Sequence, residues 1–258
     1  MFEQFLKPAS VDEAVKFKSQ FKDDAVFMAG GSKLNAAPTR STKSVAISLA
    51  GLGLGEIKAQ GGQVTIGATA TLQQVIDSPV VPAAVREAAG FVYSRNVRNQ
   101  ATFGGELFAL QNEAVLLPAL LVLNAKVLLA GGADADLASW LNGPRDALVL
   151  GVVLPEANLC CATRKIARSA GGLTVLTAAV ALAANGQQRI AIEGVISSPA
   201  RLAAVEQKQL TGEALQTAVS ETVAPVADLR GSVSYKRYIA GVVVADLLAD
   251  CQQMIKEK

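Results

Sequence analysis

Two glycine pairs followed by polar residues are the stretches of this sequence whose residue types could bind an anionic ligand. In the first, FMAGGSKLN at residues 27–35, an apolar run leads into Gly30 and Gly31, and Ser32 and Lys33 follow. Glycine permits backbone conformations in which successive N–H groups converge on one point, and such a nest suits a diphosphate. A glycine pair after a strand is also an ordinary tight turn, so this stretch alone leaves both interpretations open.

The second stretch, VRNQATFGGE at residues 97–106, has a similar character. The side chains of Arg98 and Asn99 can hold a loop through hydrogen bonds. The stretch also offers a hydroxyl and two closely approachable backbone amides, at Thr102, Gly104 and Gly105. A structural turn explains these residues equally well. Two such stretches separated by an α/β segment could instead face each other across one ligand.

Several kinds of site are excluded by the residues that are missing. No G-x-G-x-x-G opens a helix, and Lys33 has no glycine directly before it, so the Rossmann and P-loop motifs are absent. The chain has no histidine, and its cysteines, Cys160, Cys161 and Cys251, lack C-x-x-C spacing. This composition excludes a conventional zinc site, a Ser-His-Asp triad and a cysteine-ligated iron-sulfur cluster on this chain. Redox chemistry would therefore require a bound organic cofactor.

The overall composition indicates a globular protein with a substantial core. Its 258 residues are 51% hydrophobic and 18% charged, with a net charge of +2. Basic residues are scattered along the chain, so we expect neither a nucleic-acid nor a membrane surface. The first 15 residues lack the apolar segment of a secretory signal, and we expect a cytoplasmic protein.

The spacing of apolar residues predicts that the arrangement of helices and strands changes near residue 157. Before it, we expect strands at 25–28, 44–49, 63–68, 125–129 and 149–154 and helices at 10–21, 72–76, 82–89 and 114–123. After it, we expect three antiparallel strands at 163–168, 174–183 and 189–197 and helices at 213–223 and 235–255.

The two glycine stretches resemble those of a known family, the FAD-binding subunits of the molybdenum hydroxylases, which include xanthine dehydrogenase and carbon monoxide dehydrogenase. FMAGGSKL resembles the AGGT-type first loop of these subunits, and VRNQATFGGE resembles their RNxATxGGN second loop. Further matches follow in order along the chain: TIGATATL at 65–72, LLPALLVLNAKVLL at 116–129, SPAR at 198–201, LTG at 210–212 and DLRGSVSYKR at 228–237. An ordered series over nearly the whole chain is far more specific than either glycine pair.

The resemblance implies an α+β fold in two parts. The first is a PCMH-type FAD-binding domain like that of vanillyl-alcohol oxidase, at residues 1–157, with subdomains at about 1–55 and 56–157. The second is a small α+β domain at 158–258, a three-stranded antiparallel sheet with helices.

The resemblance also implies the cofactor-binding residues. First-loop residues are expected to hold the FAD diphosphate: Met28, Ala29, Gly30, Gly31, Ser32, Lys33 and Leu34. Second-loop residues are expected along the other side of the cofactor: Thr102, Gly104, Gly105 and Glu106. Lys165 matches a basic residue near the flavin ring, where a cation would stabilise an anionic reduced flavin.

Three residues depart from the family pattern. Lys33 replaces an aspartate of the first loop, Glu106 replaces an asparagine or aspartate of the second, and Val115 replaces an aspartate before the 116–123 apolar run. The departures leave two interpretations open. One is an oxidoreductase subunit, inactive alone, that passes electrons between a partner [2Fe-2S] subunit and an external acceptor or donor such as NAD, while a molybdenum-cofactor subunit hydroxylates the substrate. The other is a scaffold subunit that kept the fold but binds FAD weakly or not at all. A stand-alone flavin oxidase is disfavoured because the chain offers no candidate base.

Overall fold

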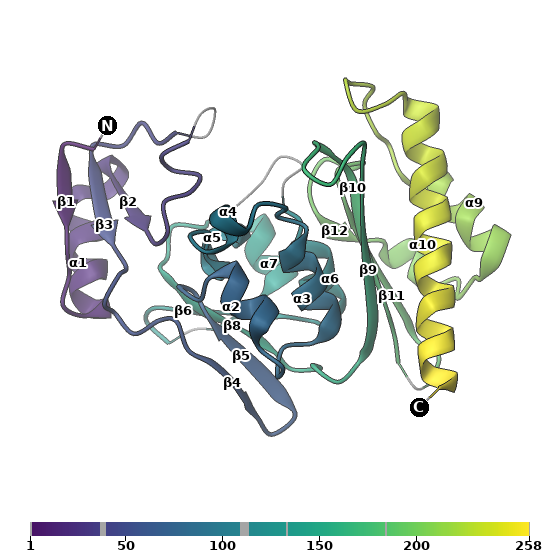
Figure 1. The fold of residues 1–258 in the computed structure, drawn as a ribbon, viewed down its shortest axis with the longest axis horizontal. Helices are drawn as coiled ribbons and strands as arrows, with labels where there is room; N and C mark the ends of the chain where they lie inside the picture. The colour runs from purple at the N-terminus through teal and green to yellow at the C-terminus, as the bar shows by residue number, and fades with distance from the viewer. Residues whose placement is uncertain (1, 37–39, 109–113, 133, 184, 258) are drawn as a thin grey trace.

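The computed structural model of the protein describes residues 2–36, 40–108, 114–132, 134–183 and 185–257. Three β-sheets follow one another along the longest axis of the molecule, from the N-terminal part at the left of Figure 1 to the long C-terminal helix at the right. The hydrophobic core is correspondingly divided into three clusters, one for each sheet and its helices.

The first sheet is parallel and has the order β1-β3-β2. Its strands are Gln4–Leu6 (β1), Ala25–Met28 (β2) and Val45–Ser48 (β3), and helix α1 at Val11–Phe21 packs against β2 and β3. The predicted start of the first helix is confirmed, because the Ser10 side chain accepts a hydrogen bond from the Glu13 N–H. The Glu13 carboxylate accepts from the N–H of Ala9, one residue before the position expected for a capping box. A short 3₁₀ helix, η1 at Lys22–Asp24, leads from α1 into β2.

The second sheet has five strands in the order β4-β5-β8-β6-β7, all paired antiparallel. The strands are Ile57–Gln60 (β4), Gln63–Gly67 (β5), Lys126–Leu129 (β6), Asp134–Asp136 (β7) and Val149–Leu154 (β8). The helices beside it are Leu72–Asp77 (α2), Ala83–Gly90 (α3), Arg95–Arg98 (α4), Phe103–Leu107 (α5), Leu117–Val122 (α6) and Leu137–Asn142 (α7). Strands β4 and β5 form a hairpin, in which Gly61 and Gly62, both with positive φ, join the strands.

The third sheet is antiparallel, in the order β12-β11-β10-β9. Its strands are Cys160–Ala167 (β9), Thr174–Leu182 (β10), Gln188–Glu193 (β11) and Ala200–Arg201 (β12). The prediction of three strands is wrong, since β12 adds a fourth. The predicted 189–197 strand ends early at Gly194, which has a φ of 94° and lies so close to β10 that a Cβ would be 2.6 Å from the Val175 carbonyl oxygen. The chain turns there and returns as β12.

Helices cover both faces of this third sheet. Ala203–Glu206 (α8), Gly212–Thr222 (α9) and Val233–Lys256 (α10) follow the sheet in sequence, and α10 packs on β9 and β10. On the opposite face, α3 and α6 contact β9, β10 and β11, so every residue of β10 is buried. This two-sided burial explains the continuous apolar sequence of β10.

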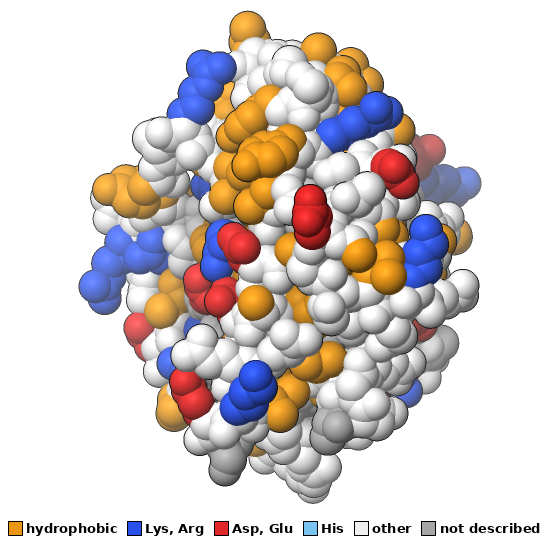
Figure 2. Space-filling view, turned by 90° about the vertical axis from the view of Figure 1, so that its right-hand side faces the viewer, with side chains coloured by type: hydrophobic (Ala, Val, Ile, Leu, Met, Phe, Trp, Pro, Cys, Tyr) orange, Lys and Arg blue, Asp and Glu red, His pale blue; other side chains and the backbone are white. Residues whose placement is uncertain are grey.

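Helix α10 is long and apolar enough, by length and composition only, to cross a membrane. In the structure it lies along the third sheet and buries one face, including Ala240, Val244 and Leu247. Its outer face carries exposed polar and aromatic side chains, among them Tyr238 and Asp246. Figure 2, which views this side of the molecule, shows basic and acidic side chains interspersed over the surface, some of them side by side. Packing against the sheet accounts for the apolar composition of this helix.

The short helices α5 and α6 of the middle part differ from the elements that the sequence predicts. The expected 114–123 helix is shorter in the structure, at Leu117–Val122, with Pro118 in its first turn, where proline is tolerated. The second glycine stretch, expected to be a loop, forms α5 instead. Thr102 caps α5 by accepting a hydrogen bond from the Gly105 N–H.

Candidate functional site

A cavity of about 760 Å³ lies between the first sheet and the middle part of the chain. Its walls come from β2, the loop that follows β2, helix α5 and residues 145–149 at the start of β8. All of the predicted site residues except Met28 and Lys165 line this cavity: Ala29, Gly30, Gly31, Ser32, Lys33, Leu34, Thr102, Gly104, Gly105 and Glu106. The volume is in the range expected for a pocket that holds an organic cofactor.

The first glycine loop lies directly on the backbone of the second stretch. A Cβ on Gly30 would be 1.7 Å from the carbonyl oxygen of Gln100, so only glycine fits there. Gly31 has a φ of 69°, a conformation that favours glycine. The glycine pair therefore allows two loops, far apart in the sequence, to meet at one wall of the cavity.

The amides of the first loop are available to a ligand. Among the residues that the structure describes, the N–H groups of Gly30, Gly31 and Ser32 donate to no protein acceptor. Successive unpaired N–H groups around a left-handed residue form an anion-binding nest. These three residues therefore have the geometry that the sequence predicted for a diphosphate loop.

In the second stretch, the backbone N–H groups of Gly104 and Gly105 are not available to a ligand. The Gly104 N–H donates to the Ala68 carbonyl oxygen at 2.9 Å, and the Gly105 N–H donates to Thr102 Oγ1 at 3.3 Å. The expectation that these two amides are offered to a ligand is wrong, because Gly104 donates to Ala68 and Gly105 donates to the residue that caps α5. Gly104 is also needed for packing, since a Cβ there would be 2.8 Å from the Ala68 carbonyl oxygen.

Arg98 has the structural role expected from its side chain. It donates to the carbonyl oxygens of Val92 and Tyr93 at 2.9 and 2.7 Å, and to the side chain of Gln73 at 3.0 Å. The side chain of Asn99 makes no hydrogen bond to another described residue. Arg98 thus fixes the segment before α4.

Two of the departures from the family pattern form an ion pair. Lys33 Nζ lies 3.2 Å from Glu106 Oε1 and 3.4 Å from Oε2, and joins the first loop to α5. The Glu106 side chain is 3% exposed and that of Lys33 33% exposed. A buried carboxylate is strongly destabilising unless it is paired. The two substitutions therefore compensate each other electrostatically.

The remaining predicted residues lie elsewhere. Met28 is the last residue of β2, below the loop, and its sulfur would be 3.4 Å from a Cβ on Gly31. Val115, the third departure, is 4% exposed and does not line the cavity. The replacement of the family's aspartate by valine therefore takes no carboxylate away from the described wall of the cavity.

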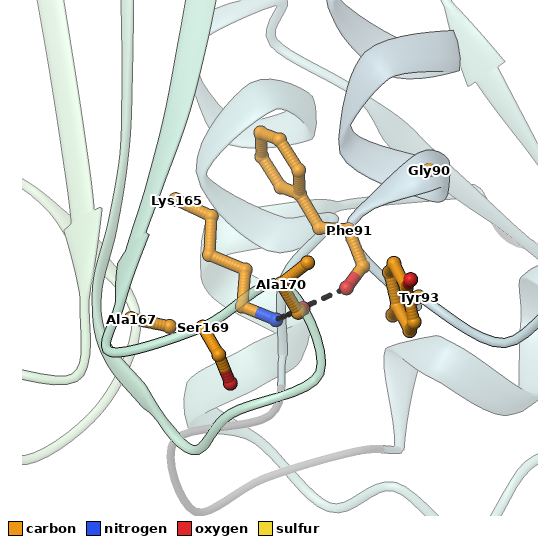
Figure 3. Close-up of a pocket in the computed structure, with 7 residues that line it drawn as sticks. All are labelled: Gly90, Phe91, Tyr93, Lys165, Ala167, Ser169 and Ala170. Carbon is orange, nitrogen blue, oxygen red and sulfur yellow. Dashed lines mark hydrogen bonds between the residues drawn. The ribbon is translucent and has the colours of Figure 1, made fainter.

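Lys165 lines a second, smaller pocket of about 350 Å³ between the end of α3 and the β9-β10 turn. Figure 3 shows its Nζ pointing to the carbonyl oxygen of Phe91, to which it donates at 3.1 Å, with the ring of Tyr93 nearby. A second, longer hydrogen bond reaches the Ala170 carbonyl oxygen at 3.5 Å. The structure thus separates Lys165 from the loops that line the large cavity.

The cavity also contains residues that sequence reasoning missed. Its described lining has four basic side chains against two acidic ones, with Lys18, Lys43, Arg145 and Asp146 beside the pair already described. Arg145 and Asp146 follow the short helix α7, which shows no recognisable motif. The excess of basic groups favours an anionic ligand.

Two loops that meet through glycine thus line a cavity with unpaired amides and an excess of basic groups, which is the arrangement of a protein that binds an anionic organic cofactor. The chain belongs to the family described as the FAD-binding domain in molybdopterin dehydrogenase, whose model matches residues 1–157. The resemblance seen in the sequence is thereby confirmed, and FAD is the cofactor of this subunit.

Relatives match this chain over almost its full length. It is 51% identical over 257 residues to the uncharacterized protein YgfM of Escherichia coli K12, covering 100% of this chain and 99% of YgfM. It is 28% identical over 279 residues to the carbon monoxide dehydrogenase medium chain of Hydrogenophaga pseudoflava, covering 93% and 94%.

Solved structures show the same fold. A chain of Hydrogenophaga pseudoflava carbon monoxide dehydrogenase lacking the Mo-pyranopterin moiety superposes with a TM-score of 0.88 at 26% identity, covering 98% of both chains. A chain of quinoline 2-oxidoreductase from Pseudomonas putida 86 superposes with a TM-score of 0.84 at 22% identity, covering 98% of this chain and 97% of that one. The latter likeness shows the fold alone.

Proposed function

We propose that this protein is the electron-transfer flavoprotein subunit of a molybdenum hydroxylase-type oxidoreductase. The observation that carries the proposal is the row of unpaired amides at Gly30, Gly31 and Ser32 in a cavity of sufficient size, within a chain of this family. The amides bind the diphosphate of FAD, and the Lys33–Glu106 pair holds the first loop against α5.

When bound, the flavin would supply the redox chemistry, since it exchanges electrons both singly, as a [2Fe-2S] centre does, and in pairs, as a nicotinamide does. The protein binds and orients it and provides no acid or base of its own. A [2Fe-2S] subunit and a molybdenum-cofactor subunit are the proposed partners, and a nicotinamide such as NAD is the proposed external acceptor or donor. The name of the Hydrogenophaga relative, a medium chain, supports a place in a multi-chain enzyme.

The scaffold alternative loses much of its support from the site. Glu106 and Val115 were its evidence, and Glu106 is paired with Lys33 while the amides of the first loop stay available. Val115 does not line the cavity.

The direct test is reconstitution of the purified protein with FAD. We expect one FAD per chain after removal of free cofactor, with flavin absorbance near about 450 nm. Co-expression with the genes of an iron-sulfur and a molybdenum subunit should yield one complex in which NADH or the hydroxylation substrate bleaches that band. A folded complex that takes up no FAD would leave only the scaffold interpretation.

Lys165 is proposed to act near the flavin ring, and its contacts also predict a structural effect. Lys165→Met leaves the Phe91 carbonyl oxygen without its hydrogen bond, at a cost of about 1 to 2 kcal/mol in the free energy of unfolding. A cation close to the flavin would in addition raise its reduction potential. We expect urea denaturation to show the first effect and a redox titration of the FAD-loaded variant to show a lower potential. An unchanged potential would restrict Lys165 to its structural role.

A further inference from the structure

Arg145 is a half-buried cationic side chain in the wall of the large cavity, and one of its hydrogen-bond donors is buried without a partner. Its Nη1 is inaccessible to solvent and has no hydrogen-bond partner among the residues that the structure describes. No described carboxylate forms a salt bridge with it, although its neighbour Asp146 also lines the cavity. A buried guanidinium N–H without an acceptor is unfavourable, so native proteins normally supply one. Nη1 itself is closed to a ligand, but Arg145 lines the cavity and makes no hydrogen bond to another described residue, so a bound anion can accept hydrogen bonds from its remaining N–H groups.

Aromatic packing holds this guanidinium in place. The Arg145 Cζ atom lies 5.8 Å from the centre of the Trp140 ring, and Trp140 is 4% exposed. The Trp140 ring also meets Phe108 edge to face, with centroids 5.3 Å apart and planes at 88°. Phe108 lines the cavity two residues after Glu106. The cluster formed by Arg145, Trp140 and Phe108 thus connects to the α5 wall, where Lys33 reaches Glu106.

The shape and charge of the guanidinium indicate which group of the ligand it binds. A planar guanidinium presents its N–H groups as a fork that matches the oxygens of a phosphate. The free amides of the first loop line the same cavity and point to a diphosphate. We propose that Arg145 binds a phosphate of FAD, opposite the amides of the first loop, with Trp140 as its positioning residue. This inference rests on the proposed function, since it assigns a further contact to the same cofactor.

The test compares Arg145→Met and Arg145→Lys with wild type, by fluorescence titration with FAD, ADP and adenosine. We expect Arg145→Met to weaken the binding of FAD and of ADP by about 10- to 100-fold and to leave the binding of adenosine unchanged. Arg145→Lys should recover only part of this loss, because an ammonium cannot donate a planar pair of hydrogen bonds. The melting temperature of the FAD-free protein should change little in either variant, since Arg145 makes no hydrogen bond or ion pair with a described residue and both replacements keep an apolar stem beside Trp140.

Arg86→Met is the matched control. Arg86 also has a buried nitrogen without a partner, Nε, but it lies on α3 and lines neither described pocket. Its removal should leave FAD affinity at the wild-type value. FAD affinity of Arg145→Met within twofold of wild type, or an equal loss for ADP and adenosine, would overturn the Arg145 assignment while leaving the proposed function intact. A wild-type protein that binds ADP but not FAD would contradict the proposed function, and the ADP titration would still decide the role of Arg145. A wild type that binds neither ligand overturns both.

Discussion

Gly31→Asp should weaken FAD binding by about 100-fold relative to Gly31→Asn. Both side chains tolerate the positive φ of this position better than other residues do. Both must displace the same neighbour, because a Cβ here would be 2.8 Å from Asn35 Nδ2. The two variants therefore differ only in charge. An added carboxylate beside a diphosphate costs on the order of 3 kcal/mol at short range, which corresponds to about 100-fold in affinity.

Fluorescence titration of both variants with FAD measures this difference directly. Circular dichroism of the two FAD-free proteins checks that each has folded, so that a loss of affinity is not a loss of structure. We also expect the gap between the variants to narrow at high salt, because ions screen the repulsion. Equal affinities for Gly31→Asp and Gly31→Asn would place the diphosphate away from the first loop.

Lys33→Met should lower the free energy of unfolding by about 2 to 3 kcal/mol. The substitution leaves the carboxylate of Glu106, at 3% exposure, without the ammonium that compensates its burial. The double variant Lys33→Met with Glu106→Gln should recover most of the loss, since it removes the charge together with its partner. Urea unfolding of the FAD-free proteins provides the four free energies of a double-mutant cycle.

Lys58→Met provides the comparison for an exposed pair. Lys58 Nζ lies 3.3 Å from Glu56, a distance close to that of the Lys33–Glu106 pair, but the two side chains are 54% and 69% exposed. Its loss should change stability by no more than about 0.5 kcal/mol. If Lys33→Met costs no more than Lys58→Met, the Lys33–Glu106 pair contributes nothing beyond a surface ion pair.

The long elements of the fold could be predicted from the sequence because each carries a repeated local signal. Strand β8 has the predicted bounds, and α10 differs from its predicted bounds by two residues at the start and one at the end. Helix α5 has only five residues, two of them glycine, so it shows neither periodicity nor helix propensity. It forms because Thr102 caps it and because Gly104 packs on Ala68. The division near residue 157 and its subdomains stay a prediction.

The sequence by itself determined the family and the cofactor, because glycine pairs in a fixed order of motifs record backbone requirements that few other folds share. Only the tertiary structure decided which side chains meet at the cavity. Lys33 and Glu106 are 73 residues apart, and each by itself is a departure from the family pattern of the cofactor loops. In the structure they form one ion pair. Lys165 carries a matching motif residue but lies in another pocket, and Arg145 carries no motif but lines the cavity. Contacts between distant segments depend on how the sheets pack, and no local pattern of residues encodes that packing.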